Sequence, residues 1–205
     1  MTVEITKREN IVGGIIMKRL SSMILCCLLL SVSIFAGELL DGSYNYNTMD
    51  LDVPGKIYYA FDFGPKDAEI AKGYIQITNE TVFEAKNGYG WMETGSLIVR
   101  RTLTLQGDQA RDMVASSDEG TFRVVLKPGR YRLTFIFNDI NFRPSMNLWI
   151  NNDPYLEKWS LPGLFMKVKY TEVELKEGTL DITLAADKDI WVINALVISE
   201  AKGLK

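Results

Sequence analysis

Aromatic rings and hydrogen-bonding side chains that suit a ligand site are concentrated in a few short motifs of this 205-residue chain. In the motif 88–91, Tyr89 and Trp91 alternate with glycines, which let a loop turn sharply while it presents a flat ring. Rings of this kind stack on the C–H faces of sugars and lose little conformational entropy when they are fixed. We therefore predict that Tyr89 and Trp91 contact a ligand. The structural alternative is that both rings pack beneath the loop.

Arg111 and Asp112 form a second candidate pair. An arginine held by its neighbouring aspartate can donate a forked pair of hydrogen bonds to vicinal hydroxyls or to a carboxylate of the ligand. Asp139 can accept hydrogen bonds from sugar hydroxyls, and Tyr155 offers a further ring within the amide-rich and aromatic segment 151–159. Each of these four residues has a structural alternative, which is an ion pair, a loop cap or ordinary turn chemistry.

The composition excludes catalysis by the common nucleophilic triads. The chain has no histidine, and its two cysteines, Cys26 and Cys27, both lie in a predicted leader. A mature chain without these residues cannot build a Ser-His-Asp or Cys-His site or the usual zinc sites. We therefore predict no catalytic residue and no enzymatic activity. A small polysaccharide lyase is the enzymatic alternative, because some lyases abstract a proton with tyrosine or lysine.

Residues 1–36 have the layout of a secretory signal peptide. A basic start at Met17 precedes the apolar run 23–35, and Ala36 and Gly37 supply small residues before the chain becomes polar. The apolar run is short for a transmembrane helix, although an uncleaved membrane anchor is the alternative. We expect translation to start at Met17 rather than at Met1. The mature protein would then be secreted, periplasmic or at the cell surface, with no transmembrane segment after cleavage.

The remainder of the chain predicts a single domain. Residues 37–55 lack clear periodicity and form a lead-in segment, residues 56–200 hold the fold, and residues 201–205 are a tail. The whole chain has a net charge of −3, and the predicted leader contains more basic than acidic residues, so the mature chain is more acidic still. An acidic surface without basic tracts argues against a nucleic-acid partner.

Residues 56–200 alternate between apolar and polar positions as β-strands do. We predict about nine or ten short strands and therefore an all-β sandwich or jelly roll. Two hairpins are expected. The first, within 122–137, turns at Pro128 and Gly129, where a type II turn needs a positive φ at the glycine. The second turns at Glu177 and Gly178.

The segments 59–64 (YAFDFG) and 191–199 (WVINALVIS) are expected to be the opening and closing strands and to be partners. Together with GYGW at 88–91, they resemble the galactose-binding-like β-sandwich domain that is found N-terminal in rhamnogalacturonan acetylesterases and related pectin-degrading enzymes. Malectin is a more distant relative. The pair Arg111 and Asp112 also resembles the family, whereas Asn138 departs from the glycine that usually precedes the aspartate at Asp139.

The resemblance implies a secreted, non-catalytic carbohydrate-binding domain. Its partner would be an oligosaccharide or a cell-wall polysaccharide, pectin-like or related, and it would act alone or beside a separately encoded polysaccharide-degrading enzyme. The alternatives are a small jelly-roll polysaccharide lyase and a structural or adhesive β-sandwich that binds a protein partner.

Related sandwiches sometimes hold a structural calcium, which makes this ion the one cofactor to consider. Asp62, Asp187 and Asp189 could supply oxygen ligands, although no spacing in the sequence demonstrates a site. The simpler expectation for Asp62 and Asn194, polar residues inside apolar strands, is a hydrogen bond between buried side chains. The residues that would bind a metal ion are therefore left unknown.

Overall fold

A computed structural model describes residues 44–45, 50–51, 53, 55–102, 110–161 and 166–201. The predicted leader, 1–36, lies outside these residues, as do most of the lead-in segment and all but the first residue of the tail. Among the described residues, no helix is long and apolar enough to cross a membrane. The strands in chain order are β1 (Tyr44–Asn45), β2 (Asp50–Leu51), β3 (Ile57–Phe63), β4 (Ile75–Ile77), β5 (Tyr89–Trp91), β6 (Ile98–Arg101), β7 (Asp112–Ser116), β8 (Gly120–Val125), β9 (Gly129–Phe137), β10 (Ser145–Ile150), β11 (Asp153–Ser160), β12 (Lys167–Leu175), β13 (Thr179–Lys188), β14 (Trp191–Ile193) and β15 (Ala195–Glu200).

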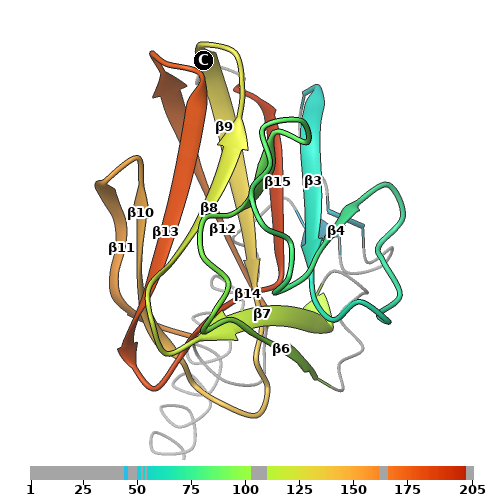
Figure 1. Cartoon of the computed structure of the whole chain (residues 1–205), viewed down its shortest axis with the longest axis vertical. Coiled ribbons are helices and arrows are strands. Elements are labelled where there is room, and N and C mark those ends of the chain that lie inside the picture. Colours follow the sequence, from blue (N-terminus) through green and yellow to red (C-terminus); the bar gives the residue numbers. More distant parts are fainter. Residues whose placement is uncertain are drawn as a thin grey trace, which may run out of the picture. The chain divides into compact units, whose positions relative to one another are not determined.

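Two five-stranded sheets make up the sandwich (Figure 1). The first, here the β8 sheet, has the order β11-β10-β13-β8-β5, and the second, the β9 sheet, has the order β12-β9-β15-β3-β4. Neighbouring strands are antiparallel except β3 and β4, which are parallel. The predicted all-β sandwich is confirmed. The two main sheets supply ten strands, and the described residues add a three-stranded sheet, β14-β7-β6, and the pair β1-β2.

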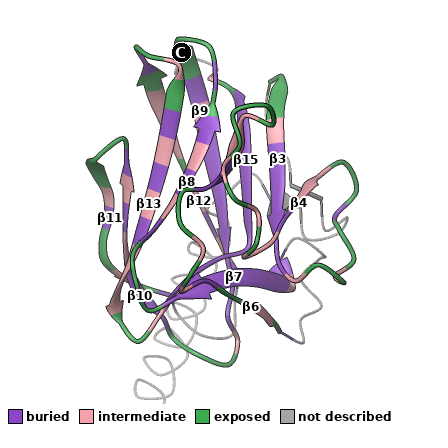
Figure 2. Cartoon of the chain, viewed as in Figure 1, coloured by how far each residue is buried: buried purple, intermediate pink, exposed green. Residues whose placement is uncertain are grey.

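The core lies between the two main sheets, and aromatic rings make contacts across it. Phe61 on β3 and Phe122 on β8 are fully buried, and their ring centroids are 5.2 Å apart across the sandwich. Phe135 on β9 makes a similar contact, at 5.8 Å, with Tyr155 on β11. Buried and partly exposed residues alternate along β13 in Figure 2. This period of two leaves polar side chains on the outer face of the β8 sheet.

The predicted pairing of the opening and closing strands is confirmed. β15 lies between β9 and β3, with Leu196 opposite Phe61. The expected closing strand is divided at Asn194, so that its first part, β14, joins the three-stranded sheet instead. The Asn194 side chain accepts a hydrogen bond from the Asn138 N–H at 2.7 Å and donates one to the Asp112 carbonyl at 2.9 Å. A buried amide therefore fixes the point at which the chain changes sheet.

The two predicted hairpins are wrong. β8 and β9 belong to different sheets, so residues 126–128 carry the chain from one layer to the other. Gly129 is the first residue of β9, pairs with Leu175, and is not among the described glycines with positive φ. Glu177 and Gly178 likewise connect β12 in the β9 sheet to β13 in the β8 sheet. In both cases successive strands bury their apolar faces against opposite layers of the core, which hairpin pairing within one sheet would not achieve.

A two-residue hairpin turn does occur between β10 and β11. Ile150 pairs with Asp153, and Asn151 and Asn152 between them have φ values of 49° and 70°. Two successive positive φ values characterise a type I′ turn, whose twist matches that of the flanking strands. Asparagine adopts this region more readily than most residues do. The turn therefore sets the register of the strand that carries Trp149.

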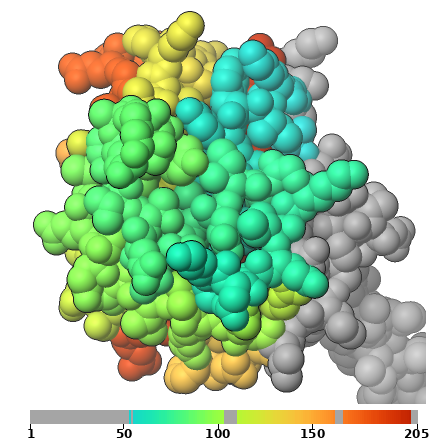
Figure 3. All heavy atoms as spheres, turned by 45° about the vertical axis from the view of Figure 1, so that its right-hand side comes forward, coloured from blue at the N-terminus to red at the C-terminus, as the bar shows by residue number. Residues whose placement is uncertain are grey.

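The segment between β4 and β5 closes one side of the sandwich, because β4 is the edge strand of the β9 sheet and β5 that of the β8 sheet. Figure 3 shows the teal and green part of the chain, to which this segment belongs, over most of that side. Isolated bridges join Val82 to Trp91 and Glu84 to Tyr89. The motif 88–91 is thus held between the segment that precedes it and β8.

Candidate functional site

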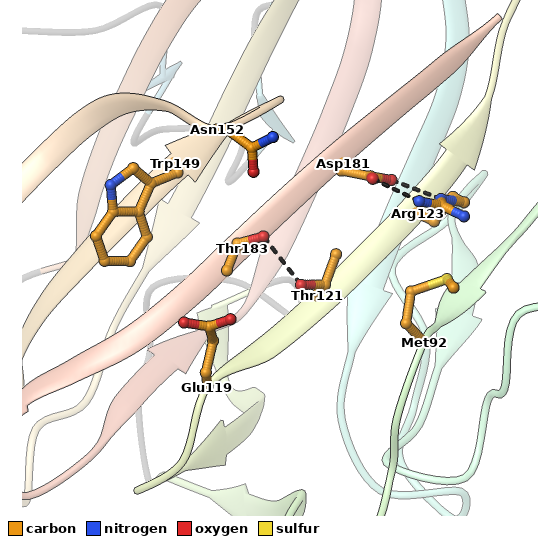
Figure 4. A pocket seen from close by; sticks show the side chains of 8 residues that line it. All are labelled: Met92, Glu119, Thr121, Arg123, Trp149, Asn152, Asp181 and Thr183. Atoms are coloured by element: carbon orange, nitrogen blue, oxygen red, sulfur yellow. Dashed lines mark hydrogen bonds and ion pairs between the residues drawn. The ribbon is translucent and has the colours of Figure 1, made fainter.

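An open depression, here called the groove, lies on the outer face of the β8 sheet (Figure 4). Its volume is about 470 Å³, within the range of roughly 300–1,000 Å³ that is usual for small-molecule sites. The side chains around it come from β8, β10 and β13, from the β10–β11 turn and from residues next to β5 and β8. They are Met92, Glu119, Thr121, Arg123, Trp149, Asn152, Asp181 and Thr183.

The alternation and register of three strands bring these side chains together. Thr121 and Arg123 take outward positions on β8, as Asp181 and Thr183 do on β13 and Trp149 does on β10. Trp149 is opposite Thr183, which in turn is opposite Thr121. Arg123 is opposite Asp181 in the neighbouring row. One row across the strands therefore carries an indole ring and two hydroxyls, and the next carries an ion pair.

The Arg123–Asp181 pair is a forked contact. Arg123 Nε donates to Asp181 Oδ1 at 2.7 Å, and Nη2 donates to Oδ2 at 2.6 Å. The hydrogen bond from Arg123 to Asp181 raises the pKa of the guanidinium above its usual value. The guanidinium carbon also lies 5.8 Å from the centre of the Phe83 ring. Two directional bonds and a ring thus hold the guanidinium plane at the edge of the groove.

Trp149 differs from the other three tryptophans of the chain. Trp91 and Trp191 are fully buried and lie against each other, and Trp159 packs on Phe137 with a centroid distance of 5.2 Å. Trp149 is only partly buried, and no other ring of the described residues contacts it. Figure 4 shows its indole at one side of the groove. This ring is placed to stack on the flat apolar face of a ligand.

The β10–β11 turn is hydrogen-bonded to β13, the strand that carries Asp181. Asn151 Oδ1 accepts a hydrogen bond from the Asp181 N–H at 2.7 Å, and the Asn151 N–H donates to the Asp181 carbonyl at 2.9 Å. The next residue of the turn, Asn152, lines the groove. The turn conformation therefore fixes both an amide side chain and the position of the carboxylate.

The motif 88–91 supports a wall of the groove. Trp91 is fully buried, and its Nε1 donates a hydrogen bond to the Thr78 carbonyl at 3.1 Å. Tyr89 is partly buried, with its ring centroid 5.1 Å from that of Phe61. Gly90 is opposite Arg123 and has a φ of 145°. The structural alternative accounts for the contacts of both rings, and ligand binding by Tyr89 and Trp91 stays a prediction.

Arg111 and Asp112 form the expected pair near the three-stranded sheet. Arg111 Nε lies 3.3 Å from Asp112 Oδ2, and Arg111 Nη1 lies 3.2 Å from Glu69 Oε2. Asp112 is buried, and Arg101 approaches its second oxygen at 3.4 Å. The geometry is that of a structural ion-pair network. A role for Arg111 and Asp112 in holding a ligand stays a prediction.

Asp139 caps the loop that follows β9. It is buried, and its Oδ1 accepts hydrogen bonds from the N–H groups of Asn141 at 3.0 Å and Phe142 at 3.2 Å. Arg100 Nη1 lies 3.3 Å from the other carboxylate oxygen, and its guanidinium carbon is 4.1 Å from the centre of the Phe142 ring. These contacts match the structural alternative for Asp139. A sugar contact by this carboxylate stays a prediction.

Tyr155 faces the core edge rather than the groove. Its Oη donates to the Tyr170 carbonyl at 2.9 Å, and its ring lies against Phe135. Tyr155 on β11 and Tyr89 on β5 are at opposite edges of the β8 sheet. Of the six predicted site residues, the structure thus brings Arg111 and Asp112 into contact and does not gather the whole set into one site.

Calcium binding stays an expectation. Among the described residues, no group of three or more histidine, cysteine or acidic side chains is arranged to hold a metal ion. Asp62 and Asn194 are close, as expected, because the Phe63 N–H donates to the Asn194 carbonyl at 2.8 Å. Asp62 Oδ2 accepts a hydrogen bond from the Ala71 N–H, and Asp187 accepts one from the Ser145 hydroxyl.

None of the residues that line the groove is among the six predicted site residues, although the sequence pattern marks several of them. The order Leu148-Trp149-Ile150 puts the tryptophan on the face opposite two aliphatic residues, and Asp181 and Thr183 alternate with leucine and isoleucine in the same way. Each pattern predicts an outward side chain. Which strands adjoin is a long-range property, and only the order β10-β13-β8 reveals that these side chains meet.

No protein-family model and no curated protein matches the sequence. Solved structures are similar in fold. Protein YxiM from Bacillus subtilis aligns with a TM-score of 0.58 at 19% identity, over 71% of this chain and 40% of that chain. A calcium-binding mutant of β-glucuronidase 2 from Bacteroides uniformis aligns with a TM-score of 0.56 at 14% identity, over 70% of this chain and 18% of that chain. The ANX1 ectodomain from Arabidopsis thaliana aligns with a TM-score of 0.53 at 15% identity, over 73% and 42%.

This chain spans less than half the length of each of these three similar structures. At such low identities the likeness shows the fold alone. The chain therefore shares its β-sandwich with part of a β-glucuronidase and with part of a plant ectodomain, and no specific family follows from it.

Proposed function

We propose that this protein is a secreted, non-catalytic carbohydrate-binding domain and that an oligosaccharide or a segment of polysaccharide lies in the groove. The observation that carries the proposal is the partly exposed Trp149 indole that lines the groove, in register with Thr183 and Thr121 on the outer face of the β8 sheet. A sugar ring has an apolar face and a rim of hydroxyls. The groove offers a matching ring and matching hydrogen-bond donors and acceptors within one depression.

The chemistry of the lining supports a sugar over a purely apolar ligand. The Thr121 and Thr183 hydroxyls are 2.9 Å apart, and each can both donate and accept a hydrogen bond. Asn152 adds an amide, and Asp181 adds a carboxylate that Arg123 already orients. Fixed polar groups of this kind determine the orientation of a ligand, while the stacking ring contributes affinity.

The similar structures support an extracellular domain that is related in fold to part of a carbohydrate-active enzyme. A β-glucuronidase includes a sandwich of this fold, and the ANX1 structure is an ectodomain, which supports an extracellular location. The absence of histidine from the sequence supports binding without catalysis. We propose that the domain acts on cell-wall polysaccharide, alone or beside a separately encoded polysaccharide-degrading enzyme.

The proposal is tested with the purified protein on a glycan array and by affinity electrophoresis in soluble polysaccharides. Trp149→Ala is expected to weaken retention at least about tenfold, because it removes the stacking ring. Tyr170→Ala is the matched control. Tyr170 is an aromatic residue that is more exposed than Trp149, but it lies on β12 in the other sheet, where it stacks on Arg132.

Equal losses in the two variants would contradict the assignment of the groove. Silence of the wild-type protein across pectins, galactans, xylans and glucans would overturn carbohydrate binding and favour a protein partner. Rising absorbance from unsaturated uronates, on incubation with pectate or alginate, would identify a lyase in place of a binding domain.

A further inference from the structure

We propose that the groove takes uncharged stretches of glycan and discriminates against uronate-rich chains. This inference rests on the proposed function and narrows its ligand class. Its basis is the balance of charge around the groove, together with the pairing of the arginines at the end of the sandwich.

The single arginine that lines the groove is already neutralised. Arg123 directs two of its nitrogens, Nε and Nη2, at the two oxygens of Asp181, so the fork that would otherwise receive a ligand carboxylate is occupied. Glu119 also lines the groove, and the structure gives it no cationic partner among the described residues. With two carboxylates and one guanidinium, the groove carries a net charge of −1.

The arginines near the three-stranded sheet are the other groups that could bind a uronate, and they are also paired with carboxylates. Arg100 is paired with Asp139 at 3.3 Å, and Arg101 is paired with Asp67 at 2.8 Å. Arg111 lies against Asp112 and Glu69. Each of these arginines therefore faces at least one carboxylate of the protein itself. A polyuronate would have to displace those carboxylates or approach them as a like charge.

The uncharged groups of the groove suit a neutral chain that crosses the strands. Trp149, Thr183 and Thr121 lie opposite one another on three strands that are neighbours in the sheet, β10, β13 and β8. Neighbouring strands are spaced by about 4.8 Å, so this row extends over roughly 10 Å. A row of this length offers contacts to more than one sugar ring of a chain. We therefore expect neutral oligosaccharides to bind more tightly than the corresponding monosaccharide.

The test compares retention of the protein in neutral polymers (galactan, arabinan, xylan and glucomannan) with retention in polygalacturonate and alginate at low salt. The wild-type protein is expected to bind at least one neutral polymer and to pass both polyuronates unretarded. In the variant E119Q/D181N the groove changes from a net charge of −1 to +1. Retention in polygalacturonate is then expected to rise at least severalfold and to fall again when salt is added.

E172Q/E174Q is the matched control, because it removes the same number of negative charges from β12 on the other sheet. It should leave polyuronate retention as in the wild type. If the double variant does not fold, the single variant E119Q tests the effect of groove charge, and the expected rise in polygalacturonate retention is then smaller. Thermal unfolding of each variant shows which of them are folded.

Three outcomes would overturn the inference, and they differ in what else they overturn. Tighter binding of polygalacturonate than of any neutral polymer by the wild-type protein would reverse the ligand class while the proposed function stands. If the folded groove variants, the control and the wild type were retained equally in polyuronates, the charge of the groove would not determine the discrimination against uronates. Absence of binding to every polymer would overturn the proposed function itself, and the inference with it.

Discussion

Gly90 is a residue at which both the sandwich and the groove depend on the absence of a side chain. Its φ of 145° is rarely adopted by L-residues, and an added Cβ would lie 2.5 Å from the Phe83 backbone nitrogen. That close approach lets the Phe83 ring reach Arg123. We expect Gly90→Ala to lower the free energy of unfolding by about 3 kcal/mol, because backbone strain and a backbone clash add together. Urea unfolding measures the change.

Gly95→Ala is the matched control for this prediction. An added Cβ at Gly95 meets no atom within 4 Å, and its φ is not in the positive region. Its substitution should change the free energy of unfolding by less than about 1 kcal/mol, and a small stabilisation is compatible with reduced freedom of the unfolded chain. If the two variants lost the same stability, the close contact at Gly90 would have no energetic importance.

At the scale of single elements, the connection from β8 to β9 depends on Tyr131. Its hydroxyl donates a hydrogen bond to the Lys127 carbonyl at 2.7 Å, and its ring lies 5.2 Å from that of Tyr58 in an edge-on contact. Tyr131→Phe keeps the ring and removes the hydroxyl. We expect this variant to lose about 1 kcal/mol of unfolding free energy at neutral pH, since the carbonyl of the connection loses its partner. Denaturant titration measures it.

The same variant has a distinct pH signature. Burial, and to a smaller degree the neighbouring Tyr58, raises the pKa of Tyr131 above its ordinary value of 10.0. The folded state therefore holds this proton more tightly than the unfolded state does. The resulting contribution to stability is complete below about pH 10 and is lost as the pH rises through the higher pKa of the folded state. The advantage of the wild type over Tyr131→Phe should shrink above pH 10, and a constant difference would contradict the assignment.

The strands could be predicted from the sequence far better than their partners could. Alternation around Phe122 and Leu180 identifies β8 and β13 correctly, because burial of one face is a local pattern. A turn at Pro128 and Gly129 looks the same whether the chain stays in one sheet or crosses to the other. The choice depends on which distant strands complete each sheet, and no local pattern records it.

The candidate site followed the same rule. Local chemistry marked Trp91 as a possible sugar platform, yet its neighbours in space, Phe63 and Phe122, bury it completely. Trp149 has the less conspicuous sequence context and the more accessible ring. Alternation in the sequence predicts which side chains point outward, whereas the sheet order determines which of them lie next to one another.

At the scale of the whole domain, the fold is completed by its last strand. β15 lies between β9 and β3 and pairs with both, and Val197 and Ile198 are almost completely buried there. The β9 sheet therefore has a gap at its centre until residues 195–200 are in place. Pairing between strands so far apart in sequence has a large loop-closure entropy, which makes folding slow compared with that of locally connected domains.

A chain shortened to end at Asn194 is therefore expected not to fold, because β9 and β3 would each expose an unpaired edge and the apolar side chains of β15 would be missing from the core. A chain that ends at Ala201 keeps the whole of β15 and should unfold cooperatively at nearly the same temperature as the full chain. Near-ultraviolet circular dichroism and thermal unfolding distinguish the two. Cooperative unfolding of the shorter chain would show that the two halves of the β9 sheet are stable without their central strand.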